Sequence, residues 1–418
     1  MSGLFLIVRR SLRQHALSTA VTVASLALAG GLVMAVFAID TQTYRAFTGS
    51  SGVFDAVLGA RGSQLQLVLN AVFHLETSPG NVPWSLYERL RADPRVSAAV
   101  PYAVGDSYRG FRVVGTTLDL FGGPEGGAGA GLSVAPPGRL FDPELREAVI
   151  GSSVARRTPL AYGARFQPKH GLVESGGEQH EEEYIVVGVL EPSGSPADRV
   201  IWIPIEGVFR MGGHVLRGGD EEFVADPRAD IPDEHKEVSA VLLKLKGGMV
   251  GASLQREINF DGREATLAWP VARVMAELFD KIGWVHRVLT LVAYLVVAVA
   301  TGSIVASLYN TMNERRREFA ILRSLGARRR TVFAAIVLES TSIALLGSLF
   351  GFALYALMVA GGAAVVRSRT GVVLDVLRPH PVLVLAPLGM VALGALAGVV
   401  PALKAYRTDV ARHLAPTS

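Results

Sequence analysis

Residues 313–330 read NERRREFAILRSLGARRR and form a dense cationic block between two long apolar runs. Wound as a helix at about 100° per residue, the block separates an apolar side from a cationic side. The apolar side carries Phe319, Ile321, Leu322 and Leu325. The cationic side carries Arg316, Arg317 and Arg323, and Gly326 is well placed as the helix C′ residue. We predict a short amphipathic helix at the cytoplasmic surface of a membrane.

A positively charged loop that only fixes membrane orientation is the alternative interpretation of this block. An apolar stripe has no use in water, however, so we expect the helix to dock on lipid headgroups or in a protein groove. The stripe therefore implies a binding partner.

The composition is typical of a membrane protein with a large soluble part. Half of the 418 residues are hydrophobic and 19% are charged, against roughly 25% charged in soluble domains. Arginine outnumbers lysine 35 to 6 and gathers at the edges of the apolar runs, which favours contact with membrane lipid and argues against nucleic-acid binding. Cysteine is absent, so the sequence offers no disulfide or thiolate site.

Four apolar runs are long enough to cross a membrane, at 16–39, 284–312, 331–366 and 381–403. The first is about 36 Å long as a helix, against a hydrocarbon core of roughly 30 Å. The apolar region of a cleaved signal peptide would be shorter, so we expect the first run to be retained as a transmembrane helix.

Positive charge flanks the runs on alternate sides and predicts cytoplasmic termini. Three arginines in the second outer loop, Arg367, Arg369 and Arg378, count against this topology but are outnumbered by the cytoplasmic ones. The predicted non-spanning segments are a cytoplasmic amphipathic segment 1–15, an outer domain 40–283, a cytoplasmic helix 313–330, a short outer loop 367–380 and a cytoplasmic tail 404–418. The fold class is a four-helix membrane protein with a large α+β extracytoplasmic domain between helices 1 and 2.

Within the outer domain, valine- and isoleucine-rich stretches bounded by Gly, Pro or Asp predict strands. They lie at 96–104, 110–115, 148–150, 184–190, 200–203 and 238–245. Helical spacing predicts helices at 63–74 and 83–90, and a stalk helix at 271–282 that continues into the second span. Ser152 is the expected cap of a short helix ending at Arg157. We expect more than one small sheet unit, and a flexible Gly-rich loop at 122–138.

Small residues in the spans predict close helix packing. The candidates are Gly302 with Ala306, Gly347 with Gly351, and Gly394 with Gly398. Glu339 is a carboxylate inside the third run, which is costly unless it is paired or near water. It either lies near the interface beside the arginines at 328–330, or it has a role in gating or in a charge pair across a subunit interface.

The outer domain also holds a cluster of imidazoles and carboxylates that could bind a divalent transition metal. The candidate ligands are His170, His180, His214 and His235, with Glu174, Glu178 and 181–183 nearby. Their spacing matches no closed site, and acidic runs in loops are usually solvated surface. Metal binding therefore remains a hypothesis.

The stretch 314–327, continued by Phe333, Glu339, Gly347 and Gly351, resembles the FtsX-like permease family of type VII ABC transporters, which includes the MacB-like permeases. The similarity lies in the arginine-rich start, the apolar core, the Leu-Gly-Ala of 325–327, and the downstream Glu followed by spaced glycines. The termini, at 9–13 and 401–410, also resemble the family. Phe319-Ala320 stands where many relatives have Ile-Gly.

The resemblance implies a homodimer in the bacterial inner membrane, with a separate cytoplasmic ABC ATPase that binds ATP and Mg²⁺, and no cofactor in this chain. A periplasmic adaptor or binding protein is a possible further partner. The ATPase-coupling residues that the resemblance implies are Arg315, Arg316, Arg317, Glu318, Phe319, Ile321, Leu322, Arg323, Leu325 and Gly326. Independently, none of the six lysines lies in a Gly-Lys-Ser or Gly-Lys-Thr context, so the chain has no phosphate-binding loop.

Two functions remain open. The first is a permease that uses a partner's ATP hydrolysis to export or extract a substrate at the periplasmic side. The second is a signalling protein that controls a periplasmic partner, as some FtsX-type relatives do. An integral-membrane enzyme is disfavoured because no nucleophile with a base and no carboxylate pair stands out. The sequence does not identify the substrate.

Overall fold

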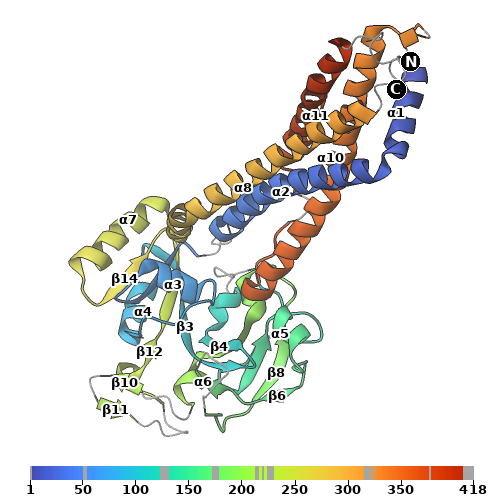
Figure 1. Ribbon diagram of the computed structural model, residues 1–418. Helices are drawn as coiled ribbons and strands as arrows, with labels where there is room; N and C mark the ends of the chain where they lie inside the picture. Colours follow the sequence, from blue (N-terminus) through green and yellow to red (C-terminus); the bar gives the residue numbers. More distant parts are fainter. Residues whose placement is uncertain are drawn as a thin grey trace. The chain divides into compact units, whose positions relative to one another are not determined.

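The structure is a computed structural model. It describes residues 2–49, 54–122, 131–171, 178–211, 216–218, 221–223, 230–314, 321, 323, 324, 326–375 and 378–407. The chain divides into two compact units, which are described separately (Figure 1). A helical unit contains Met1–Gln42, Ile282–Ala364 and Asp375–Ser418, and an outer unit contains Thr43–Lys281 and Val365–Leu374.

The helical unit confirms the four expected apolar helices. Its helices are α1 (Ser2–Gln14), α2 (Ala16–Gly49), α8 (Val271–Glu314), α10 (Arg329–Thr370) and α11 (Val382–Arg407). Within the described residues, all except α1 are long and apolar enough to span a membrane. α2, α8 and α10 extend well beyond their apolar runs, and each contributes residues to both units.

Glycines place the membrane helices in close contact. A Cβ atom added at Gly347 would meet Leu26 of α2, and one added at Gly351 would meet the backbone of the same helix. On α11, Gly394 and Gly398 lie against Ala344 and Ser340 of α10. Lipid offers no hydrophobic force between helices, so such close approach is the main source of packing energy. In contrast, Gly302 of α8 has no atom of the described chain within 4 Å of that position.

The outer unit is built on one mixed sheet. Its order is β14-β1-β13-β3-β4-β9-β5-β8-β6, and β7 pairs with β3 off this path. The strands are β1 (Ala56–Ala60), β3 (Val96–Tyr108), β4 (Phe111–Thr116), β5 (Glu147–Ile150), β6 (Arg165–Phe166), β7 (Lys169–His170), β8 (Tyr184–Val189), β9 (Val200–Pro204), β13 (Ala240–Leu245) and β14 (Ala265–Ala268). Two further sheets are two-stranded, β2 (Val82–Pro83) with β12 (Glu237–Val238), and β10 (Leu216–Gly218) with β11 (Glu221–Phe223).

The central strand of this sheet is β3. Its first half, from Val96 to Tyr102, pairs with β13, and its second half, from Ala103 to Tyr108, pairs with β4. The sequence therefore predicts the strand positions well but not their assembly. The described residues form more than one sheet, as expected, but the sequence did not indicate that the 13-residue strand β3 joins ten of the strands into one large sheet.

Short helices connect the strands. They are α3 (Gln64–Ala71), α4 (Trp84–Arg91), α5 (Ser152–Arg157), α6 (Ile205–Phe209) and α7 (Gly248–Arg256), with 3-10 turns η1 (Leu118–Phe121), η2 (Pro196–Arg199) and η3 (Asp233–His235), and a π-helical turn η4 (Glu257–Asp261). Ser63 caps α3 by accepting a hydrogen bond from the Gln66 amide. The expected Ser152 cap was wrong, because Gly151 is the N-cap of α5 and Ser152 is its first residue.

Alternating side chains give the sheet two hydrophobic faces. One face contains Leu58, Ile201 and Leu243, and it is covered by α4, α5, α6 and α7. The other face contains Val57, Trp202 and Leu242, and it is covered by α3, the end of α2 and the start of α8. We call this second set of buried residues the stalk-side core.

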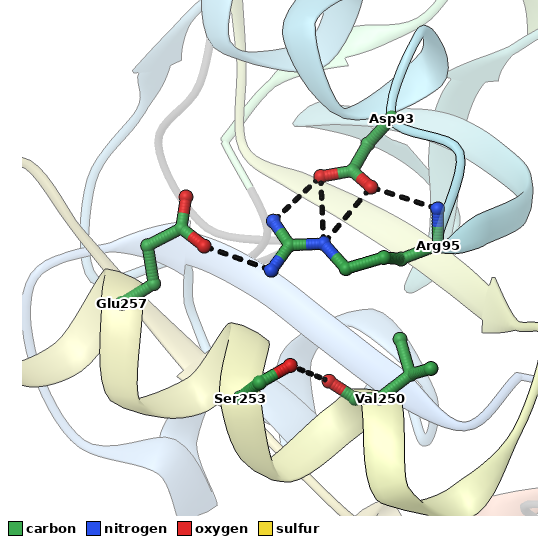
Figure 2. A network of polar contacts seen from close by, with 5 residues as sticks. All are labelled: Asp93, Arg95, Val250, Ser253 and Glu257. Atoms are coloured by element: carbon green, nitrogen blue, oxygen red, sulfur yellow. Dashed lines mark hydrogen bonds and ion pairs between the residues drawn. The ribbon is translucent and has the colours of Figure 1, made fainter.

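An ion-pair network ties α4 and β3 to the π-helical turn (Figure 2). Arg95 donates to both Asp93 carboxylate oxygens, with Nη2 2.7 Å from Oδ2, and its Nη1 lies 2.9 Å from Glu257 Oε2. The hydrogen bonds from Arg95 hold the pKa of the Asp93 carboxyl below its usual range. A planar guanidinium suits this double contact. The network lies at the surface of the outer unit, because the Glu257 side chain is exposed.

Candidate coupling sites

Much of the predicted cytoplasmic helix lies outside the described residues. This applies to Arg315, Arg316, Arg317, Glu318, Phe319, Leu322 and Leu325. Of the described residues, Ile321 is 45% exposed. The Gly326 amide donates to the Arg323 carbonyl at 3.1 Å, and Gly326 has a φ of 98°, which L side chains rarely adopt. Such geometry is what a helix C′ glycine provides.

Two cation–aromatic contacts hold α11 beside the hairpin between α8 and α10. The Lys404 ammonium donates a hydrogen bond to the Tyr309 hydroxyl at the end of α8, and it lies 4.0 Å from the ring centroid. The Arg329 guanidinium, at the start of α10, lies 5.8 Å from the ring centroid of Tyr406. Both contacts are of the cation–π type. They therefore connect the two helix ends that flank the hairpin to the third helix.

Glu339 is buried in α10, where its Oε1 accepts a hydrogen bond of 2.5 Å from the Ser11 hydroxyl of α1. A carboxylate within an apolar helix needs such a partner. The contact links α1 to α10, so the amphipathic N-terminal helix packs on the membrane helices through its buried side. Arg9 and Arg10 on its other side are exposed.

Aromatic rings join the two stalk segments within the outer unit. The Phe279 ring of α8 lies 5.6 Å from Tyr44 and 5.9 Å from Phe47 of α2, measured between centroids. Phe47 also stacks on Phe73, 4.9 Å away, after the end of α3. Edge-to-face and offset pairs at these distances are stabilising. The pairs explain why α2 continues past its apolar run, since Tyr44 and Phe47 fall on one helical face.

The end of α10 is held within the outer unit through the Ser368 carbonyl. Arg157 Nη1 donates to the Ser368 carbonyl at 3.1 Å, and the Arg199 guanidinium donates to the same oxygen. Cations are favoured at a helix C-terminus, where carbonyls lack helical partners. Burial, together with neighbouring Arg157 and Arg369, lowers the pKa of Arg199. The predicted outer loop 367–380 therefore begins inside α10, and this helix end is bound by Arg157 and Arg199.

The residues after α10 continue this contact. Gly371 turns the chain with a φ of 80°, Val372 is buried in the stalk-side core, and the Val373 amide donates to the Gly194 carbonyl at 3.1 Å. Asp198 fixes the 193–195 loop, because its carboxylate accepts from the Ser193 and Gly194 amides, each at 3.0 Å. We call residues 193–199 with 368–373 the α10 dock.

The sequence did not indicate the α10 dock. Arg157, Asp198 and Arg199 are far from residues 368–373 along the chain, and their pairing depends on the sheet.

The candidate histidines separate into different places. His170 and His180 come together beside Asp106, a residue that the sequence did not single out. His235 lies at the end of η3 with its Nε2 3.8 Å from Glu234 Oε1, and His214 is outside the described residues. The three grouped residues come from segments that are distant in sequence, so spacing alone did not reveal them.

Four apolar helices and a mixed α/β domain inserted after the first define a multi-pass membrane protein with a large domain outside its spanning helices. A family model of the MacB-like periplasmic core domain matches residues 19–259, more than half of the chain, and one of the FtsX-like permease C-terminal region matches residues 290–410. The chain belongs to the FtsX/MacB-type permease family of ABC transporters. Its members are typically non-catalytic membrane subunits, and membership implies an ATPase partner.

Two solved structures are similar to the outer part of the chain. The periplasmic region of MacB from Actinobacillus actinomycetemcomitans is 9% identical, covers 55% of this chain and 95% of its own, and has a TM-score of 0.35. The extracellular domain of the noncanonic ABC-type transporter YknZ from Gram-positive bacteria is 15% identical. The match covers 50% of this chain and 97% of that domain, with a TM-score of 0.29. Neither likeness is close enough to carry an argument. No curated protein matches the sequence.

Proposed function

We propose that this permease couples ATP hydrolysis by a separate cytoplasmic ATPase to export or extraction of a substrate at the periplasmic side. The ATPase binds ATP and Mg²⁺, and it binds the permease at residues 313–330. Both termini of the permease are cytoplasmic. The permease works as a homodimer. Family membership supports the ATPase partner, and the arginine-flanked hairpin supports its place of attachment.

The observation that carries the proposal is the convergence of three membrane helices on one core. The end of α2 brings Phe47, the start of α8 brings Val271 and Met275, and the segment after α10 brings Val372 to the stalk-side core. Each of these helices continues without a break from the helical unit. A shift of the helices therefore has three covalent routes into one face of the sheet. This arrangement favours transmission of force over a role as a passive anchor.

A two-residue Gly-Ser insertion between Lys281 and Ile282 tests the coupling. A spin label at Tyr162→Cys, which is exposed in a chain without cysteine, reports the distance between the two copies in nanodiscs with the ATPase. We expect ATP to change this distance in the parent protein and not in the insertion variant. The matched control is the same insertion between Gly126 and Gly127, in the Gly-rich segment. An unchanged ATP response in the Lys281 variant contradicts the proposal.

The ATPase attachment is tested by replacing the apolar side of the cytoplasmic helix. Leu322→Asp with Leu325→Asp is expected to abolish co-purification with the ATPase, because charge replaces the docking stripe. Ser324→Asp is the matched control, since Ser324 is exposed and outside that stripe. Retention of the complex by the double variant would show that the docking surface lies elsewhere.

The orientation of the chain is tested by single cysteines and an impermeant thiol reagent. In intact spheroplasts we expect labelling at Tyr162→Cys and none at Ser324→Cys. The reverse pattern would place the arginine hairpin outside the cell and remove the basis for ATPase attachment there.

A further inference from the structure

Three possible metal ligands meet in the outer unit where β7 pairs with the second half of β3. Asp106 lies in β3 and His170 lies in β7. His180 ends the segment 178–180, which runs beside β7. β7 pairs antiparallel with β3, and this register sets His170 directly opposite Asp106. On the other side of β7, the His170 amide donates to the Glu178 carbonyl at 2.9 Å and the His180 amide donates to the Pro168 carbonyl at 3.0 Å. Backbone pairing therefore fixes the backbone positions of all three residues.

The ligand atoms have the separations of a tetrahedral site. Asp106 Oδ1 lies 3.0 Å from His180 Nε2 and 3.4 Å from His170 Nδ1, and all three lie within 4.8 Å of one another. Metal–ligand bonds of about 2.0–2.1 Å in a tetrahedron place neighbouring ligand atoms roughly 3.3–3.4 Å apart. The distance of 3.4 Å to His170 agrees with this value, and the distance of 3.0 Å to His180 is a hydrogen-bond distance about 0.3 Å shorter, which an ion would widen.

Burial gives the three ligands different roles. Asp106 and His180 are buried, whereas the His170 side chain is 53% exposed. Two ligands are therefore held by the fold and the third stands at the surface, which leaves a route for an ion. The register of β3 against β4 shifts between Val104 and Asp106, and such bulges redirect side chains at functional positions.

We propose that Asp106, His170 and His180 bind one divalent transition-metal ion, with Zn²⁺ preferred. Two imidazoles and one carboxylate form a donor set that Zn²⁺ accepts, and the fourth position faces solvent and takes water or a ligand. The ion would join β3, β7 and the 178–180 segment, three pieces of backbone that meet at this point. A hydrogen-bonded histidine–aspartate pair without metal is the competing explanation for the same geometry.

The experiment uses the full-length protein in nanodiscs, purified through a tag without histidine and treated with chelator. Zn²⁺ is titrated in competition with a chromophoric chelator at pH 7.5. We expect one saturable site per chain, and Asp106→Asn and His170→Gln are expected to lower its affinity about 10- to 100-fold or more. His170→Gln changes an exposed side chain. Without metal, the thermal unfolding of this variant should therefore equal that of the parent protein.

Two control variants separate this site from unspecific binding. His235→Gln removes a histidine elsewhere in the same unit, and Glu181→Gln removes an exposed acidic residue next to His180. Both should bind Zn²⁺ as the parent does. Co²⁺ in place of Zn²⁺ should give the visible absorption of a tetrahedral ion, which His170→Gln should lose. The proposal would be overturned by the absence of saturable binding at micromolar Zn²⁺. It would also be overturned if Asp106→Asn and His170→Gln bound Zn²⁺ with the affinity of the parent protein.

Discussion

The two units of the chain differ in their largest buried side chains. In the outer unit these include Tyr87, Tyr102 and Tyr184, whereas the helical unit contributes Met34 and also buries Ala29 and Ala344 completely. A domain in water gains stability by removing large apolar surfaces from solvent. Helices in lipid gain it by bringing backbones close together, which small residues permit. The outer unit therefore depends on large buried side chains, and the helical unit depends on close contacts between helices.

The largest expected effect comes from deleting bulk in the outer unit. Trp202 is buried in the stalk-side core, 6.3 Å from the Phe121 ring centroid. Trp202→Ala should destabilise this unit by about 3–5 kcal/mol, because it leaves a cavity. Thermal unfolding followed by tryptophan fluorescence of the remaining indoles measures the change. Tyr162→Ala, at an exposed position, is the control and should have little effect; equal losses in both would refute the assignment of the core.

Adding bulk in the helical unit is expected to have the next largest effect. Gly347→Leu should cost about 1–3 kcal/mol or prevent assembly of α2 on α10, because the new side chain meets Leu26. The measurement is the midpoint of thermal aggregation in detergent. Gly302→Leu makes the same change where the chain leaves open space, so it should be tolerated by a single chain. Similar losses for both would show that closeness is not what stabilises this unit.

A smaller, pH-dependent effect is expected at His74. Its ring packs between Tyr102 and Trp202, each 5.7 Å away by centroid distance. Burial of the ring, followed by the charge of Arg112, lowers the pKa of His74 to about 3. The folded pKa lies below the unfolded value, so protonation favours unfolding.

The contribution of His74 should therefore decrease as the pH falls below about 6.5, by roughly 1–2 kcal/mol at pH 5. His74 has a φ of 55°, and His74→Asn keeps a residue that tolerates this conformation. The variant should show a flatter profile of unfolding midpoint against pH for the outer unit. A profile parallel to that of the parent would contradict the prediction.

The smallest expected effect is at the rim network of Figure 2. Asp93→Asn removes the charge opposite Arg95 and should cost roughly 0.5–1 kcal/mol, because the pair is partly solvated. The loss should shrink in high salt. It should also shrink as the pH falls from the unfolded pKa of Asp93 through its lower folded pKa, because the parent carboxyl is then protonated in the folded protein as well. Unfolding midpoints at two salt concentrations check this. A salt-independent loss would indicate a packing defect.

The sequence predicted what local patterns determine. The strand predicted at 184–190 is observed at Tyr184–Val189, and the stalk helix begins at Val271 as expected. Alternation and helical spacing are properties of neighbouring residues, so they can be read from one segment. Polar residues such as Asp40 and Arg45 hid the continuation of α2, although Tyr44 and Phe47 make packing contacts from one of its faces.

What the sequence missed depends on long-range pairing. Asp106 and His180 are 74 residues apart and meet at 3.0 Å because β7 lies beside β3. Arg199 reaches the end of α10 across a separation of 169 residues. The ATPase-coupling residues and the predicted dimer stay predictions.

The single long strand β3 limits how the outer domain can change in size. Since one uninterrupted segment pairs with β13 at one end and β4 at the other, deleting its middle would cut the sheet in two. Insertions and losses among relatives are therefore expected at the margins of the sheet, beyond β6 and β14, or in the β10–β11 ribbon, which forms a separate sheet. Changes in the length of this domain are therefore tolerated at the borders of the sheet and not within β3.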